Sequence, residues 1–302
     1  MNRSQSTFRC ADAARERADP LAGSAPPARR WLLLEHPGPW RIDAIAGAGI
    51  DPAVLSVLTS AAGSATRILL VRRSGRIDRR APRSWVLTGL DATTTTSTWQ
   101  DDKDLLDAAE AMIETPASAT RRAESMILVC THGVHDVCCA LRGRPVASAL
   151  SSRWPELVWE CSHIGGDRFA PNLVLLPDGF YYGNLDPQSA VTTVEAHLGG
   201  TVLPDRLRGM ARFLPPVQAA IIAIYQRYGP LGPSDVTVRA TEHIGPHYGH
   251  RSETFVDLVI EPQQQMVKVQ VLSVRRADAQ LTCRAVRETP ATEYRIIDIA
   301  PS

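Results

Sequence analysis

The sequence predicts a mixed α/β protein made of several units, and three observations lead to that prediction. A chain of 302 residues is long enough to bury a large core and to form more than one unit. Over its first two thirds, short apolar runs of strand length alternate with segments of helical periodicity. Beyond residue 200, one apolar helix is followed by runs typical of antiparallel strands. The predicted class is therefore α/β (α+β), with a small α+β appendage at the C-terminal end.

The N-terminal α/β unit, residues 29–118, is expected to have the order β-α-β-β-α. Its strands are predicted where short apolar runs occur, at residues 31–35, 68–71 and 85–87. The first helix is predicted from Pro52, because Asp51 can cap it and proline suits the first helical position. The apolar residues of segment 102–113 recur at helical spacing and predict the second helix.

The next unit, residues 119–200, repeats this order. Its strands are predicted at residues 126–129, 157–159, 172–176 and 180–182. One helix is expected to start at Pro145 and to run to residue 152, and a second follows the capping residue Asp186. The order fits a thioredoxin-like layer of helices on a small mixed sheet, and it makes the N-terminal half a degenerate copy of the same arrangement.

The two ends of the chain differ from these units. Residues 1–28 are rich in Ala, Arg and Pro and are expected to form a flexible lead-in. The C-terminal α+β region, residues 201–302, begins with a helix over 217–228 that is opened by Pro215 and Pro216. Its strands are predicted at residues 236–239, 254–260, 266–272, 281–283 and 294–297.

Composition narrows the class of function. The formal net charge of +1 does not favour nucleic acid or an acidic partner. No apolar run approaches the roughly 20 residues of a membrane-spanning helix, and no apolar signal segment is present near the N-terminus. We therefore expect a cytoplasmic protein that does not bind membranes. In that compartment six cysteines, most of them clustered, indicate metal or redox chemistry rather than a disulfide scaffold.

The candidate site is carried by two loops that follow neighbouring predicted strands. Cys130 comes directly after the first strand, and Cys139 lies nine residues further on. After the next strand come His163 and Asp167, with two glycines between them that allow backbone N–H groups to approach a bound group. Sulfur and nitrogen ligands on two such loops predict a metal or iron–sulfur pocket.

Other residues near this window have plainer interpretations. Cys138 is expected to be buried packing, because free cysteine is among the most buried residue types. His132 and His135 are expected to lie beside the site without binding metal. Cys10 and Cys283 are expected to play no part in it.

Three strings resemble the sucrase/ferredoxin-like family. They are Cys-Thr-His-Gly-x-x-Asp-x-Cys-Cys-Ala from Cys130, Trp-Glu-x-Ser-His-Ile-Gly-Gly-Asp-Arg-Phe-Ala-x-Asn from Trp159, and Leu-Pro-Asp-Gly-x-x-Tyr-Gly from Leu176. Segments 31–40 and 215–220 resemble the same family, so the likeness covers most of the chain. The resemblance implies a thioredoxin-like [2Fe–2S] ferredoxin.

The resemblance also implies a set of cluster ligands. Cys130 and Cys139 match the first pair at C-x8-C spacing, and His163 falls on the first position of the second pair. Asp167 stands where the histidine-ligated branch of the family carries a second histidine, which makes it the leading fourth ligand despite its hard oxygen atoms. The softer alternatives for the fourth position are Cys161, Cys138 and, by folding back, Cys283.

The predicted function is one-electron transfer by a carrier or redox module that meets a redox partner protein, rather than hydrolysis. A thioredoxin-like thiol redox protein is one alternative, although the C-x-x-C motif that it requires is missing from the sequence. The other alternative is a structural zinc-binding protein that uses cysteine and histidine ligands.

Overall fold

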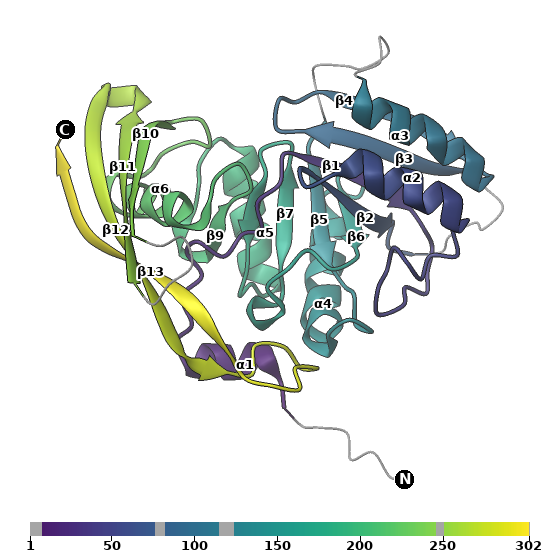
Figure 1. Ribbon diagram of the computed structural model, residues 1–302, viewed down its shortest axis with the longest axis horizontal. Helices are drawn as coiled ribbons and strands as arrows, with labels where there is room; N and C mark the ends of the chain where they lie inside the picture. The colour runs from purple at the N-terminus through teal and green to yellow at the C-terminus, as the bar shows by residue number, and fades with distance from the viewer. Residues whose placement is uncertain (1–7, 76–81, 115–123, 246–250, 302) are drawn as a thin grey trace.

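The computed structural model describes residues 8–75, 82–114, 124–245 and 251–301, and its main feature is one nine-stranded mixed sheet (Figure 1). The strand order is β4-β3-β1-β2-β6-β5-β7-β8-β9. A second sheet of four strands lies at the C-terminal end of the chain. The predicted mixed α/β class is confirmed.

The first half of the large sheet comes from the N-terminal unit. Its elements are β1 (Arg30–Glu35), α2 (Pro52–Ala62), β2 (Thr66–Arg72), β3 (Arg83–Gly89), β4 (Thr94–Trp99), η1 (Asp102–Leu105) and α3 (Leu106–Ile113). Asp51 caps α2 as predicted, because its side chain accepts from the N–H groups of Ala53 and Val54. Strand β4 was not predicted, since its threonines and serine carry no apolar pattern.

The second half of the sheet carries the candidate ligands. Its elements are β5 (Met126–Cys130), α4 (Val137–Arg153), β6 (Val158–Cys161), η2 (Asp167–Phe169), β7 (Leu173–Leu176), β8 (Phe180–Tyr182), α5 (Pro187–Leu198), η3 (Pro204–Arg206) and β9 (Leu207–Met210). Asp186 caps α5 with a capping box, as its sequence predicts. Strand β9 was not predicted, because Arg208 and Gly209 interrupt its short apolar pattern.

The two halves share one topology. In the first half β1 pairs in parallel with β2 and antiparallel with β3, and β3 pairs with β4. In the second half β5 pairs in parallel with β6 and antiparallel with β7, and β7 pairs with β8. The equivalent strands β2 and β6 join the halves by antiparallel pairing, with Val71 opposite Cys161. The predicted repeat is therefore present as a shared strand order.

Helices cover one face of this sheet and the N-terminal segment covers the other. Apolar side chains of α2 and α3 pack on one face of the first half, and those of α4 and α5 pack on the corresponding face of the second half. The opposite face of both halves packs against Cys10, Ala11, Ala25 and Ala28.

Residues 8–28 correct the expectation of a flexible lead-in over residues 1–28, of which residues 1–7 lie outside the described part of the chain. Residues 10–16 form helix α1 (Cys10–Glu16), in which Cys10, Ala11 and Ala14 are buried. The small side chains allow this helix to lie close to the sheet, and the guanidinium of Arg15 donates to the carbonyl of Ala170 at 3.0 Å. The alanine content that suggested a loose segment is therefore what permits its packing.

Helix α4 begins earlier than predicted. It starts at Val137 rather than at Pro145, because the side chain of Asp136 accepts from the N–H of Cys138 and caps the helix. Pro145 lies inside the helix, which tolerates it at the loss of one backbone hydrogen bond. Cys138 and Cys139 consequently belong to the first helical turn rather than to a loop.

The C-terminal region is a helix packed on an antiparallel sheet. Its elements are α6 (Pro215–Tyr228), β10 (Val236–Ile244), β11 (Arg251–Ile260), η4 (Glu261–Gln263), β12 (Gln265–Ala279) and β13 (Thr289–Pro301). Residues 281–283, expected as a strand, instead lie in the loop between β12 and β13. Figure 1 shows this loop beside α1, although the loop and the helix are far apart in the sequence.

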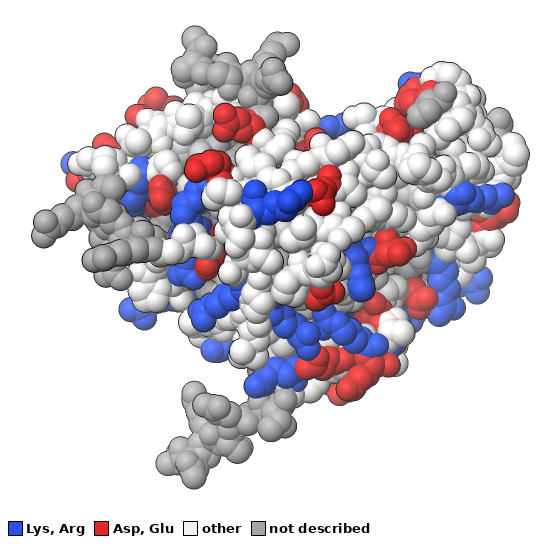
Figure 2. Space-filling view, turned by 180° about the vertical axis from the view of Figure 1, so that it is seen from behind, with Lys and Arg blue, Asp and Glu red and all other residues white. Residues whose placement is uncertain are grey.

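None of the described helices is long and apolar enough to cross a membrane. On the face shown in Figure 2, acidic and basic side chains are interspersed, in keeping with the net charge of +1.

Gly143 sets how closely α4 approaches β5. A Cβ atom at this position would lie 2.1 Å from the carbonyl oxygen of Cys130, which is a backbone atom and cannot move aside freely. Only glycine therefore allows the helix that carries Cys139 to pack at this distance from the strand that carries Cys130.

Gly143→Ala is expected to destabilise the protein by about 1–3 kcal/mol, because the added methyl group forces the helix and the strand apart. In an unpacked helix the same change would stabilise by roughly 1 kcal/mol, so the sign itself tests the packing. Ser148→Ala, at an exposed position of the same helix, is the matched control and should shift stability by no more than about 0.5 kcal/mol. Urea unfolding of the wild type and of both variants measures the change in stability. Equal unfolding midpoints for Gly143→Ala and Ser148→Ala would contradict the prediction.

Candidate metal centre

The site lies at the carboxyl ends of β5 and β6, where two loops meet. Cys130 is the last residue of β5, and its N–H donates to the carbonyl of Asn172 at 3.0 Å. Cys139 reaches the same place from the first turn of α4, and His163 comes from the loop after β6. The two sulfur atoms and an imidazole nitrogen lie within 4.8 Å of one another. The structure therefore brings together three of the four predicted ligands.

The loop after β6 is shaped by two glycines and one buried arginine. Gly165 and Gly166 have positive φ angles of +91° and +79°, which glycine adopts without strain. The guanidinium of Arg208 is fully buried and donates to the carbonyl of Gly165 at 2.8 Å and to Asn172 Oδ1 at 2.9 Å. A Cβ at Gly166 would lie 2.3 Å from that guanidinium. The two glycines therefore allow the backbone to turn here and allow the guanidinium of Arg208 to lie close to it.

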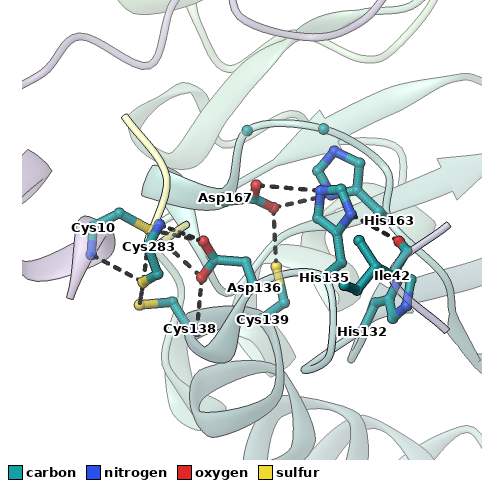
Figure 3. A network of polar contacts seen from close by, with 12 residues as sticks. Cys10, Ile42, His132, His135, Asp136, Cys138, Cys139, His163, Asp167 and Cys283 are labelled. Atoms are coloured by element: carbon teal, nitrogen blue, oxygen red, sulfur yellow. Dashed lines mark hydrogen bonds and ion pairs between the residues drawn. The ribbon is translucent and has the colours of Figure 1, made fainter. Parts of the chain in front are cut away.

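Asp167 lies at the centre of the polar contacts. Its Oδ1 is 2.9 Å from Nδ1 of His163 and accepts from the Cys139 thiol at 3.3 Å, while its Oδ2 is 3.6 Å from Nε2 of His135 (Figure 3). Burial opposes ionisation of this carboxyl, but His135 and His163 hold its pKa well below the usual value. Asp167 is therefore a carboxylate that contacts two of the other predicted ligands.

His135 lies beside the site, as the sequence predicts, and contacts both His163 and Asp167. Its ring stacks on that of His163, with ring centroids 3.8 Å apart, and its Nδ1 lies 3.2 Å from the carbonyl oxygen of Ile42. His132 faces away, with Nε2 at 2.7 Å from the carbonyl oxygen of Arg41. The only sequence signal for His135 was its place one residue before the helix cap, and the contact with residues 41–42 could not be read from local sequence.

The pKa values of the two thiols and of the imidazole are shifted in different directions. Hydrogen bonding from Cys139 lowers the pKa of Cys130 well below the usual thiol value, against the opposing effect of burial. The same bond, together with burial, raises the pKa of Cys139. Burial lowers the pKa of His163, but Asp167 and Cys130 outweigh it and raise the pKa to about 9. A metal bound by all three residues would have to displace the protons of Cys139 and His163.

The alternative fourth ligands lie elsewhere. Cys161 is buried in the apolar cluster that also contains Cys130, and it belongs to none of the potential metal-binding groups found among the described residues. Cys138 turns away from Cys139, and its sulfur lies 3.5 Å from that of Cys283. Among the described residues, three groups of side chains lie close enough together that they could hold a metal ion: Cys130, Cys139 and His163; His135, His163 and Asp167; and Cys10, Asp136, Cys138 and Cys283.

Comparison with known proteins adds a family assignment. The sequence model of the family described as sucrase/ferredoxin-like matches residues 21–209, which is more than half of the chain. No curated protein matches the sequence.

Solved structures of a thioredoxin-like [2Fe–2S] ferredoxin from Aquifex aeolicus also match. One cysteine-to-serine variant shares 23% identity and another shares 21%, and each match covers 28% of this chain and 97% of the other, with a TM-score of 0.25. A further structure of that ferredoxin matches at 21% identity over 28% of this chain and 88% of the other, again with a TM-score of 0.25.

Proposed function

The chain belongs to the sucrase/ferredoxin-like family, and on that premise we propose that it is an electron-transfer protein that carries a [2Fe–2S] cluster with mixed cysteine and histidine ligation. The observation that supports this most directly is the convergence of Cys130, Cys139 and His163 within 4.8 Å at the ends of two neighbouring strands. When bound, such a cluster would supply one-electron redox chemistry.

The donor set fits this group. Thiolates are the usual ligands of iron–sulfur clusters, and imidazole replaces them on one iron in Rieske centres. Cys130 and Cys139 would bind one iron, and His163 would bind the other together with Asp167. The carboxylate is a hard ligand, but it is ionised and already contacts both His163 and Cys139. We therefore keep Asp167 as the proposed fourth ligand, with His135 as the candidate that the structure adds.

The exposure of the ligands is uneven, and this favours electron exchange with a partner protein. Cys130 and Cys139 are each 1% exposed, whereas the side chains of His163 and His135 are 29% and 31% exposed. The imidazole edges thus form the path between the buried sulfurs and solvent. Ile42 is 53% exposed close to His135, so it can add an apolar contact for a redox partner.

Two other functions use the same residues. A single zinc ion would accept two thiolates, an imidazole and a carboxylate in tetrahedral geometry. In a thiol redox protein, Cys130 and Cys139 would instead pass two electrons and two protons to a substrate and form a disulfide. Iron and acid-labile sulfide in the purified protein distinguish the proposed function from both, because neither alternative contains them.

Cys130→Ser and Cys139→Ser should each lower the iron and sulfide content by at least about tenfold, because a hydroxyl group is a poor substitute for a thiolate and even the loss of a ligand's hydrogen-bond partner typically costs about 10–100-fold in metal affinity. Cys161→Ala is the matched control and should keep both the cluster and its visible absorption. Cys138→Ala should also keep the cluster, because the sulfur of Cys138 is turned toward Cys283 and away from Cys139. Full iron and sulfide in the two serine variants would remove these cysteines from the ligand set. Bleaching by Cys138→Ala with retention in Cys139→Ser would move the ligand by one residue.

Asp167→Ala should abolish cluster binding, because its carboxylate is the proposed fourth ligand, while His135→Ala should retain the iron. The iron-to-protein ratio after anaerobic reconstitution measures both. The reverse result, with iron lost only from His135→Ala, would transfer the fourth position to His135 and leave Asp167 as the hydrogen-bond partner of His163.

His163→Cys should lower the reduction potential, because a thiolate places more negative charge on the cluster than a neutral imidazole does. Two histidines raise the potential of Rieske centres from about −400 mV to roughly −150 to +300 mV, so one histidine should account for about 100–300 mV. Protein-film voltammetry on both forms measures the change, and His132→Ala controls for loss of a neighbouring histidine. An unchanged potential with the cluster still bound would exclude His163 as a ligand.

A further inference from the structure

Three cysteines and one aspartate form a second group on the other side of the first turn of α4. Cys138 and Asp136 come from α4 and its cap, Cys10 begins α1, and Cys283 comes from the loop between β12 and β13. Figure 3 shows Cys138 turned toward Cys10 and Cys283, whereas Cys139 faces Asp167. Two neighbouring cysteines therefore serve two separate groups.

The four ligand atoms lie within 4.8 Å of one another, and the shortest distances among them are close to those in the coordination shell of one ion. The sulfur of Cys283 lies 3.5 Å from the sulfurs of both Cys138 and Cys10. The Cys10 sulfur lies 3.5 Å from Asp136 Oδ2. In a tetrahedron with Zn–S bonds of about 2.3 Å, two sulfurs are about 3.8 Å apart, and a sulfur and an oxygen are about 3.5 Å apart.

Backbone groups already orient these side chains. The N–H of Cys283 donates to Asp136 Oδ2 at 2.7 Å, and the N–H of Cys138 donates to Oδ1 at 2.9 Å. The N–H of Cys10 donates to the sulfur of Cys283 at 3.4 Å, a contact that favours a thiolate. Backbone N–H groups therefore already hold the carboxylate of Asp136 and the sulfur of Cys283 in place.

We propose that Cys10, Asp136, Cys138 and Cys283 form a structural Zn²⁺ site that fastens α1 and the loop between β12 and β13 to the second half of the large sheet. Thiolates with a tetrahedral arrangement favour zinc among the common divalent ions. The ion would join α1, the loop after β12 and the cap of α4. This site is separate from the proposed iron–sulfur centre and does not depend on it.

A disulfide accounts for the arrangement less well. A bond between Cys10 and Cys283 or between Cys138 and Cys283 would use two of the three thiols and leave the third, Cys138 or Cys10, as a buried thiol. All four side chains take part when one divalent ion is bound, since three thiolates and a carboxylate complete a tetrahedron.

Metal analysis of the purified full-length chain tests the proposal. The wild type should contain one zinc per chain, and the double variant Cys10→Ala/Cys283→Ala should contain at least about tenfold less. Cys161→Ala removes a buried cysteine outside both groups and should keep its zinc. Cys130→Ser/Cys139→Ser should keep its zinc as well, which separates this site from a zinc ion in the first one.

X-ray absorption at the zinc edge of the wild type gives a readout that does not depend on the variants folding. Three sulfur atoms at about 2.3 Å and one oxygen at about 2.0–2.2 Å are expected. Wild-type protein without zinc, a Cys10–Cys283 disulfide found by mass spectrometry, or zinc lost only from Cys130→Ser/Cys139→Ser would each overturn the proposal.

Discussion

The close packing of α4 on β5 is the constraint on which both cysteine groups depend. Gly143 allows the helix to touch the backbone of Cys130, and Asp136 fixes where the helix begins. Successive residues of a helix point about 100° apart, so Cys138 and Cys139 project from the first turn in different directions. A helix that began later, or lay further from the strand, would bring neither cysteine to its partners.

The first half of the repeat supports the site of the second half. The antiparallel pairing of β2 with β6 joins the two halves and places the loop after β1 next to the candidate centre. In this loop the carbonyl groups of Arg41 and Ile42 contact His132 and His135. Arg72 on β2 donates to Glu160 at 2.7 Å, and the hydroxyl of Thr131 donates to the same carboxylate oxygen at 2.8 Å. One copy thus carries the candidate ligands and the other holds the loops that bear them.

Local sequence predicted those parts of the structure whose signals are local. The apolar runs of β1, β5 and β7 and the capping residues Asp51 and Asp186 act over a few positions, and these elements were found as expected. The start of α4 was misplaced because Pro145, a strong start signal, lies inside the helix and the true cap was overlooked. Cys10 and Cys283 were expected to play no part in the site, because they are far apart in the sequence and no local pattern predicts that they meet.

The N-terminal segment shields one side of the candidate centre from solvent. Cys10, Ala25 and Ala28 cover the sheet face that carries the buried Cys130, so solvent is kept from the sulfur side of the centre. The imidazole of His163 remains partly open. A buried, low-dielectric sulfur side raises the cost of added charge there, whereas an exposed edge lets a partner approach. In the proposed electron carrier, exchange at the histidine edge would therefore depend on the packing of the N-terminal segment as much as on the proposed ligands.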